Sequence, residues 1–68
     1  MNEDKLNVSL RKFLKTVGVT SQREIEKAIR DAVQSGKIKG NEKLAAKIVL
    51  TVGGVGLHHE VKGDLDLE

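Results

Sequence analysis

The residues best suited to chemistry lie near the C-terminus, where two adjacent histidines follow a glycine-rich segment. His58 and His59 carry imidazole nitrogens, which bind metal ions and exchange protons near neutral pH. The residues around them alternate between apolar and polar, which is typical of a β-strand, and neighbouring strand residues point to opposite faces. The two rings therefore cannot chelate one ion without a distorted backbone. We expect His58 to face solvent and His59 to be partly covered near a turn.

Two other motifs resemble chemical sites but have simpler interpretations. The Gly53–Gly56 segment is not followed by a helix or a Lys-Ser/Thr pair, so we interpret it as a hairpin turn and not a phosphate site. The carboxylates of Glu60, Asp64 and Asp66 fall on the outer face of a strand, where charge keeps an edge soluble. No serine, threonine or lysine has a recognisable base beside it, and a short chain offers little enclosed space for catalysis. The sequence predicts a protein that is not an enzyme and has no cofactor or metal site.

Length and composition favour one small domain over residues 1–68. The chain has 38% hydrophobic residues, a single aromatic residue and no cysteine, so disulfides and thiolate metal sites are excluded. No apolar run reaches the length of a membrane span, and no signal-peptide core is present. We therefore expect a cytoplasmic protein without a membrane partner. Its small core must be stabilised by tight packing or self-association.

A first helix is predicted over residues 3–17. Asn2 is placed to cap its start, and Gly18 fits the left-handed position that ends a helix. One apolar stripe with helical period supports this prediction. Its members are Leu6, Leu10, Phe13, Leu14 and Val17.

A second helix is predicted over residues 21–35. Ser21 and Glu24 have the spacing of a capping box, in which each side chain satisfies the other's backbone N–H. Gly36 is predicted to be the left-handed residue that ends this helix. The apolar residues of the segment are Ile25, Ala28, Ile29, Ala32 and Val33.

The apolar period changes to two at Leu44, which predicts strands over residues 44–52 and 57–66. The glycine-rich turn between them would make an antiparallel hairpin with one apolar side. If Val52 pairs with Leu57, the other pairs on that side are Leu50–His59, Ile48–Val61, Ala46–Gly63 and Leu44–Leu65. A tighter turn over Gly53 and Gly54 would shift the register by two and keep the same faces.

These elements predict an α+β fold with two layers in the order α-α-β-β. A helical hairpin would pack on one face of the C-terminal antiparallel β-hairpin, because only this arrangement removes both apolar surfaces from water. A two-stranded sheet is barely stable alone and has two open edges. We therefore expect the partner to be an unidentified protein or a second copy, forming a homodimer through a hairpin edge.

Charge supports a second hypothesis, nucleic-acid binding. Residues 1–50 carry 11 Lys and Arg against 6 Asp and Glu, whereas residues 51–68 carry 1 against 4. The stretch from Phe13 to Gln22 resembles the turn of a helix-turn-helix, and the hairpin would then be the wing of a winged helix. A third helix is missing, however, and an acidic wing would repel phosphate, so protein association remains the first hypothesis. The candidate nucleic-acid contacts are Gln22, Arg23, Lys27, Arg30, Arg11, Lys12 and Lys15.

The sequence as a whole resembles a family. The residues that carry the resemblance are LRKFLKTVGVTSQREIEKAI, followed by SGK and GNE, with the MNED opening and the alternating C-terminal strand. It is similar to an uncharacterised family of small bacterial proteins, about 65–70 residues long, with a domain of unknown function. The resemblance implies a bacterial, stand-alone protein and supplies no activity, ligand or site residue.

Overall fold

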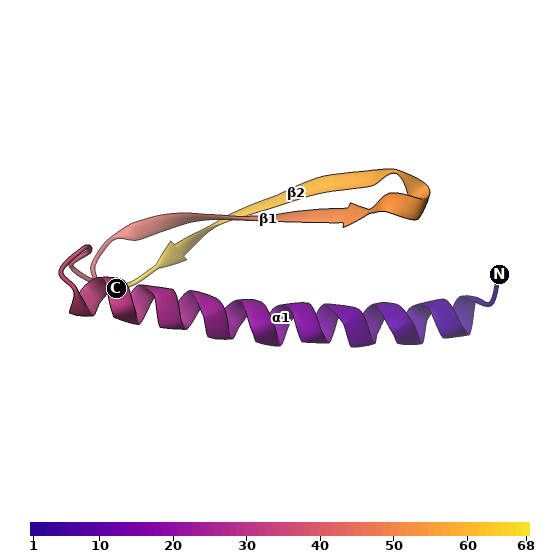
Figure 1. Cartoon of the computed structure of the whole chain (residues 1–68), viewed down its shortest axis with the longest axis horizontal. Helices are drawn as coiled ribbons and strands as arrows, with labels where there is room; N and C mark the ends of the chain where they lie inside the picture. The colour runs from indigo at the N-terminus through magenta and orange to yellow at the C-terminus, as the bar shows by residue number, and fades with distance from the viewer. The chain divides into compact units, whose positions relative to one another are not determined.

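The computed structural model describes all of residues 1–68 as one long helix followed by a β-hairpin (Figure 1). Its elements are helix α1 (Glu3–Gln34), strand β1 (Lys43–Val52), the 3-10 turn η1 (Gly53–Val55) and strand β2 (Leu57–Asp66). The chain forms two compact units, Met1–Lys37 and Ile38–Glu68. The first unit contains the helix, and the second contains the hairpin.

The prediction of two helices in an α-α-β-β arrangement is wrong, because α1 continues through Gly18 without a break. Positive φ angles occur only at Gly36, Gly40 and Gly56, so Gly18 keeps ordinary helical geometry. An interior glycine costs a helix only about 1 kcal/mol, less than the backbone hydrogen bonds that a turn would remove. Just before it, the Thr16 hydroxyl donates to the carbonyl oxygen of Lys12, 3.1 Å away, as expected inside a helix.

The apolar pattern also explains why the helix continues. Leu6, Val17 and Ala28 are spaced 11 residues apart, which is close to three full turns of an α-helix. The two predicted stripes are therefore in phase and form one stripe. Ser21 lies on this stripe in the helix interior, so the predicted capping box with Glu24 does not form.

Both outer ends of α1 match their predictions. The Asn2 side chain accepts a hydrogen bond from the backbone N–H of Lys5 at 3.1 Å and caps the first turn. At the other end, Gly36 has φ +78°. Its N–H donates to the Val33 carbonyl at 3.1 Å, and the N–H of Lys37 donates to the Ala32 carbonyl at 2.9 Å. This pair of bonds is a Schellman ending.

The hairpin register is confirmed pair by pair. Val52 lies opposite Leu57, and the same register places Ala46 opposite Gly63 and Leu50 opposite His59. The strands begin and end within one residue of the prediction. The connecting turn closes with a hydrogen bond of 3.2 Å from the N–H of Gly56 to the carbonyl of Gly53, and Gly56 has φ +66°.

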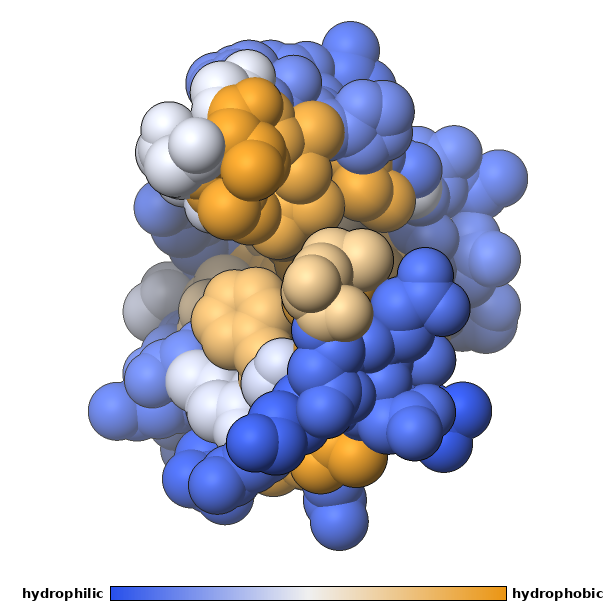
Figure 2. All heavy atoms as spheres, turned by 90° about the vertical axis from the view of Figure 1, so that its right-hand side faces the viewer, coloured by the Kyte–Doolittle hydropathy of each residue, from blue (hydrophilic) through white to orange (hydrophobic).

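The chain has no fully buried residue. Its least exposed apolar side chains are only half-buried, and these are Val17, Ile25, Ile29, Ala32, Ile38, Leu44, Ala46, Leu50, Leu65 and Leu67. Hydrophobic surface is visible on the hairpin near its turn (Figure 2), where Val55 is 77% exposed and Val52 is 44% exposed. Several large apolar side chains of both units are therefore exposed to solvent.

Candidate functional site

The most prominent surface feature of α1 is an apolar patch in its N-terminal half. The patch consists of Leu6, Leu10, Phe13 and Leu14, with exposed fractions of 42%, 45%, 54% and 56%. At about 100° per residue, these side chains lie within about 100° of arc on one side of the helix. Full burial of one such side chain stabilises a protein by about 1.5–3 kcal/mol. The patch is therefore the candidate site of this chain.

The continuous helix divides the predicted nucleic-acid contacts between two strips. At about 100° per residue, four of them share an arc of about 60° on the side opposite the apolar stripe. These four are Lys12, Arg23, Lys27 and Arg30, and Lys5 extends their row. The other three, Arg11, Lys15 and Gln22, lie on a neighbouring strip. The helix-turn-helix that would present them to a major groove is absent, because no turn interrupts α1.

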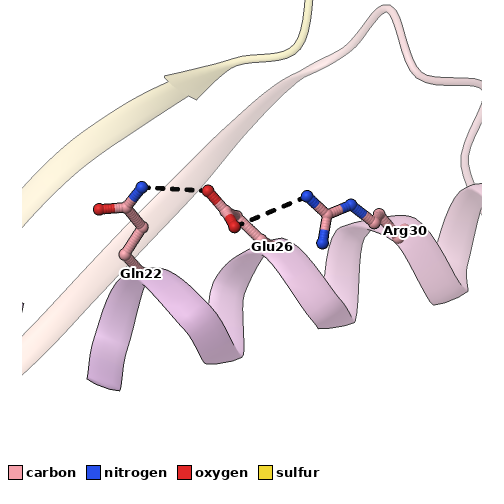
Figure 3. Close-up of polar contacts among 3 residues, drawn as sticks. All are labelled: Gln22, Glu26 and Arg30. Atoms are coloured by element: carbon pink, nitrogen blue, oxygen red, sulfur yellow. Dashed lines mark hydrogen bonds and ion pairs between the residues drawn. The ribbon is translucent and has the colours of Figure 1, made fainter. Parts of the chain in front are cut away.

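An acidic residue interrupts this basic surface. Glu26 accepts a hydrogen bond from Gln22 Nε2 at 3.1 Å and forms an ion pair with Arg30 at 3.6 Å (Figure 3). The three residues follow one another at intervals of one helical turn, which brings their side chains together. Two of the predicted nucleic-acid contacts, Gln22 and Arg30, are therefore already engaged within the helix.

The outer face of the hairpin carries balanced charge, so the expectation of an acidic exterior is wrong. Lys43 lies opposite Asp66, and the two form an ion pair at 3.8 Å. Lys47 lies opposite Lys62, and Glu60 is 3.8 Å from each of these ammonium groups. The lysines of β1 offset the carboxylates of β2. The charge balance of residues 51–68 leaves out these lysines, because Lys43 and Lys47 lie before residue 51.

The two histidines of the hairpin lie on opposite faces, as strand alternation requires. His58 lies opposite Thr51 on the outer face, and His59 lies opposite Leu50 on the apolar face. Both rings are exposed. No group of three or more metal-binding side chains comes together in the chain.

At mid-hairpin, the pair Ala46 and Gly63 lines a shallow hollow that is open to solvent.

Glu42 has a role that sequence reasoning missed. Its carboxylate accepts hydrogen bonds from three successive backbone N–H groups, those of Lys39 and Gly40 at 2.8 Å and of Asn41 at 3.1 Å. The bond from Lys39, followed by that from Gly40, holds the pKa of Glu42 below its ordinary value of 4.5. Gly40 has φ +101°, and this conformation turns the amides inward. A glycine two residues before a glutamate was the available signal.

Together, one amphipathic helix and one antiparallel hairpin define a small α+β module whose candidate site is an open surface. The chain belongs to a family of unknown function, DUF6494, whose model matches residues 1–68. This confirms the family resemblance noted from the sequence. Comparison with curated proteins and with solved structures finds no match. No helix of the chain has an apolar stretch long enough to cross a membrane.

Proposed function

We propose that this protein is a non-enzymatic association module, which acts by covering its apolar patch on α1 with another protein surface. The observation that carries the proposal is the exposure of Leu6, Leu10, Phe13 and Leu14 in a chain without a buried residue. Contiguous exposed apolar patches mark interaction sites in soluble proteins, because covering them removes apolar surface from water.

Two features support a role without catalysis. Catalytic side chains work in sites that exclude water, where electrostatic interactions are strong. Here no polar or charged side chain is buried. The clear pKa shift of Glu42 has a structural cause, because its carboxylate orders the connector between α1 and β1.

The proposal can be tested by photo-crosslinking in cells that produce the protein. Phe13→benzoylphenylalanine places a crosslinker in the patch, and Lys12→benzoylphenylalanine places it on the opposite side of α1 as a control. We expect crosslinks from position 13 that are absent from position 12. They should disappear when the patch also carries Leu10→Asp, because a buried carboxylate is costly.

The products distinguish between kinds of partner. A crosslinked product of twice the chain's mass would show a second copy, and a product with a different polypeptide would show another partner. Either product supports an association module if Leu10→Asp removes it. The absence of a crosslink at Phe13, or equal crosslinking at Lys12, would contradict the proposal.

We propose nucleic-acid binding through the basic face of α1 as the second candidate. The observation in its favour is that Lys12, Arg23, Lys27 and Arg30 share one arc of the helix. Cations in a row along a helix suit a phosphate backbone and give binding without sequence specificity. The ion pair of Arg30 with Glu26 weakens this surface.

Salt dependence tests this second candidate. The logarithm of the binding constant falls linearly with the logarithm of the salt concentration, and each phosphate contact makes this slope steeper by about 1. Substituting the four cations by alanine should therefore reduce the slope by about 4 and abolish binding at physiological salt. Lys43→Ala with Lys62→Ala is the control, since these lysines lie on the hairpin. Undetectable binding to duplex DNA or RNA at low salt would exclude the candidate.

A further inference from the structure

We infer that the apolar patch of α1 binds the same patch on a second copy, in an antiparallel pair of helices related by a two-fold axis at Leu10. This inference rests on the proposed function and identifies the partner. Three of the four patch residues are symmetric about the centre, because Leu6 and Leu14 lie four residues before and after Leu10, whereas Phe13 has Asn7 as its counterpart. A two-fold axis at Leu10 therefore places Leu6 of one copy at the level of Leu14 of the other.

Charge selects the antiparallel orientation. Glu3 and Asp4 lie at the N-terminal end of the patch, and Arg11 and Lys15 lie toward its C-terminal end. In an antiparallel pair, Asp4 of one copy lies almost beside Lys15 of the other. Measured along the helix axis, the two residues are about 2 Å apart. A parallel pair would place every charged residue at the level of its own copy, which is unfavourable, whereas the antiparallel pair places like charges at the same level only for Lys5 and Lys15. The antiparallel arrangement also opposes the two helix dipoles.

Cysteine crosslinking tests this geometry directly, because the chain contains no cysteine of its own. Leu10→Cys should form a disulfide between copies, since the axis brings the two positions together. A mixture of isotope-labelled Leu6→Cys and unlabelled Leu14→Cys should form a mixed disulfide. Leu6→Cys alone should not crosslink, because its two copies are about 12 Å apart along the axis. Lys12→Cys, on the opposite side of α1, is the control.

Sedimentation of the unmodified chain gives an independent measurement. We expect a dimer at micromolar concentration. Leu10→Asp should raise its dissociation constant at least 100-fold, and Lys12→Asp should leave the constant unchanged. Circular dichroism checks that both variants stay helical. A monomer at millimolar concentration would overturn the inference, as would a Leu6→Cys disulfide or a dimer that keeps its affinity in Leu10→Asp. The last result would instead favour pairing through a hairpin edge.

The photo-crosslinking experiment separates this inference from the proposed function. A specific product with a different polypeptide and none of twice the chain's mass would retain the association module and exclude the second copy. The absence of any crosslink from Phe13 would contradict both.

Discussion

The carboxylate of Glu42 accepts a hydrogen bond from the backbone N–H of Lys39 at 2.8 Å, across the turn that leads from α1 into β1. Gly40 and Asn41 donate to the same carboxylate. Three donors around one carboxylate favour its charged form, which is why the pKa of Glu42 is lowered. This connector is therefore ordered by one side chain.

We predict that acid loosens this connector. Because the pKa of Glu42 is lower in the folded chain than in the unfolded one, its stabilisation is fully present above the ordinary value of 4.5. It is lost as the pH falls from about 4.5 through the lower, folded value. The protection factors of the Lys39, Gly40 and Asn41 amides, which compare their hydrogen exchange with that of an unstructured peptide at the same pH, should fall over this range.

Glu42→Gln should remove this pH dependence, because the amide does not ionise. The three amides should then have lower protection factors than in the unmodified chain at pH 7, and these factors should change little on acidification. Glu24→Gln, which removes a carboxylate in the middle of α1, should behave like the unmodified chain. Protection that is identical in Glu42→Gln at pH 7 would show that the carboxylate does not order the connector.

The second prediction concerns Gly18 and Gly36, which the sequence predicts in the same way, as residues that end a helix. Gly18→Ala should stabilise the protein by about 0.5–1 kcal/mol, because alanine is the better residue in a helix interior. An added Cβ meets nothing within 4 Å at this position. Gly36→Ala should destabilise by about 1–2 kcal/mol, because φ +78° is unfavourable for any residue with a Cβ.

Urea denaturation followed by circular dichroism measures both effects. The pair is a matched comparison, since neither added methyl group meets another atom within 4 Å. Only the backbone conformation differs between the two sites. If Gly18→Ala destabilised the chain as much as Gly36→Ala, the helix would have to break at Gly18 after all.

The same two glycines show why sequence reasoning predicted part of this fold and missed the rest. Gly18 and Gly36 each follow an amphipathic segment, and local sequence does not distinguish an interior glycine from a terminal one. The phase of the apolar residues does distinguish them, because Leu6, Val17 and Ala28 continue one stripe across Gly18. After Gly36, the next segment has strand period, so no helical stripe could continue.

The hairpin was predictable because each of its determinants is local. Alternation fixes which residues share a face, and the glycine-rich turn limits the register to two choices, of which the structure has the one with Val52 opposite Leu57. The apolar patch of α1 was visible as part of a stripe. Its exposure was not, because residue types show which side chains are apolar but not which ones remain uncovered.

The third prediction concerns the like charges of Lys47 and Lys62, which lie directly opposite each other on the outer face of the hairpin. Glu60 is 3.8 Å from both ammonium groups, and its negative charge offsets the repulsion between them. Glu60→Gln should destabilise the protein by about 0.5 kcal/mol at low salt, because facing like charges then lack a counter-charge. Urea denaturation should show the difference shrinking at 1 M salt, where exposed charges are screened.

Two further variants make this prediction specific. Asp64→Asn removes a carboxylate that lies opposite Ala45, and it should have a smaller effect. Adding Lys62→Gln to Glu60→Gln removes the facing charge and should restore most of the lost stability. If the double variant were no more stable than Glu60→Gln alone, repulsion between the two lysines would not be the cause. The role of Glu60 would then lie in its packing against Val49, the residue it faces on β1.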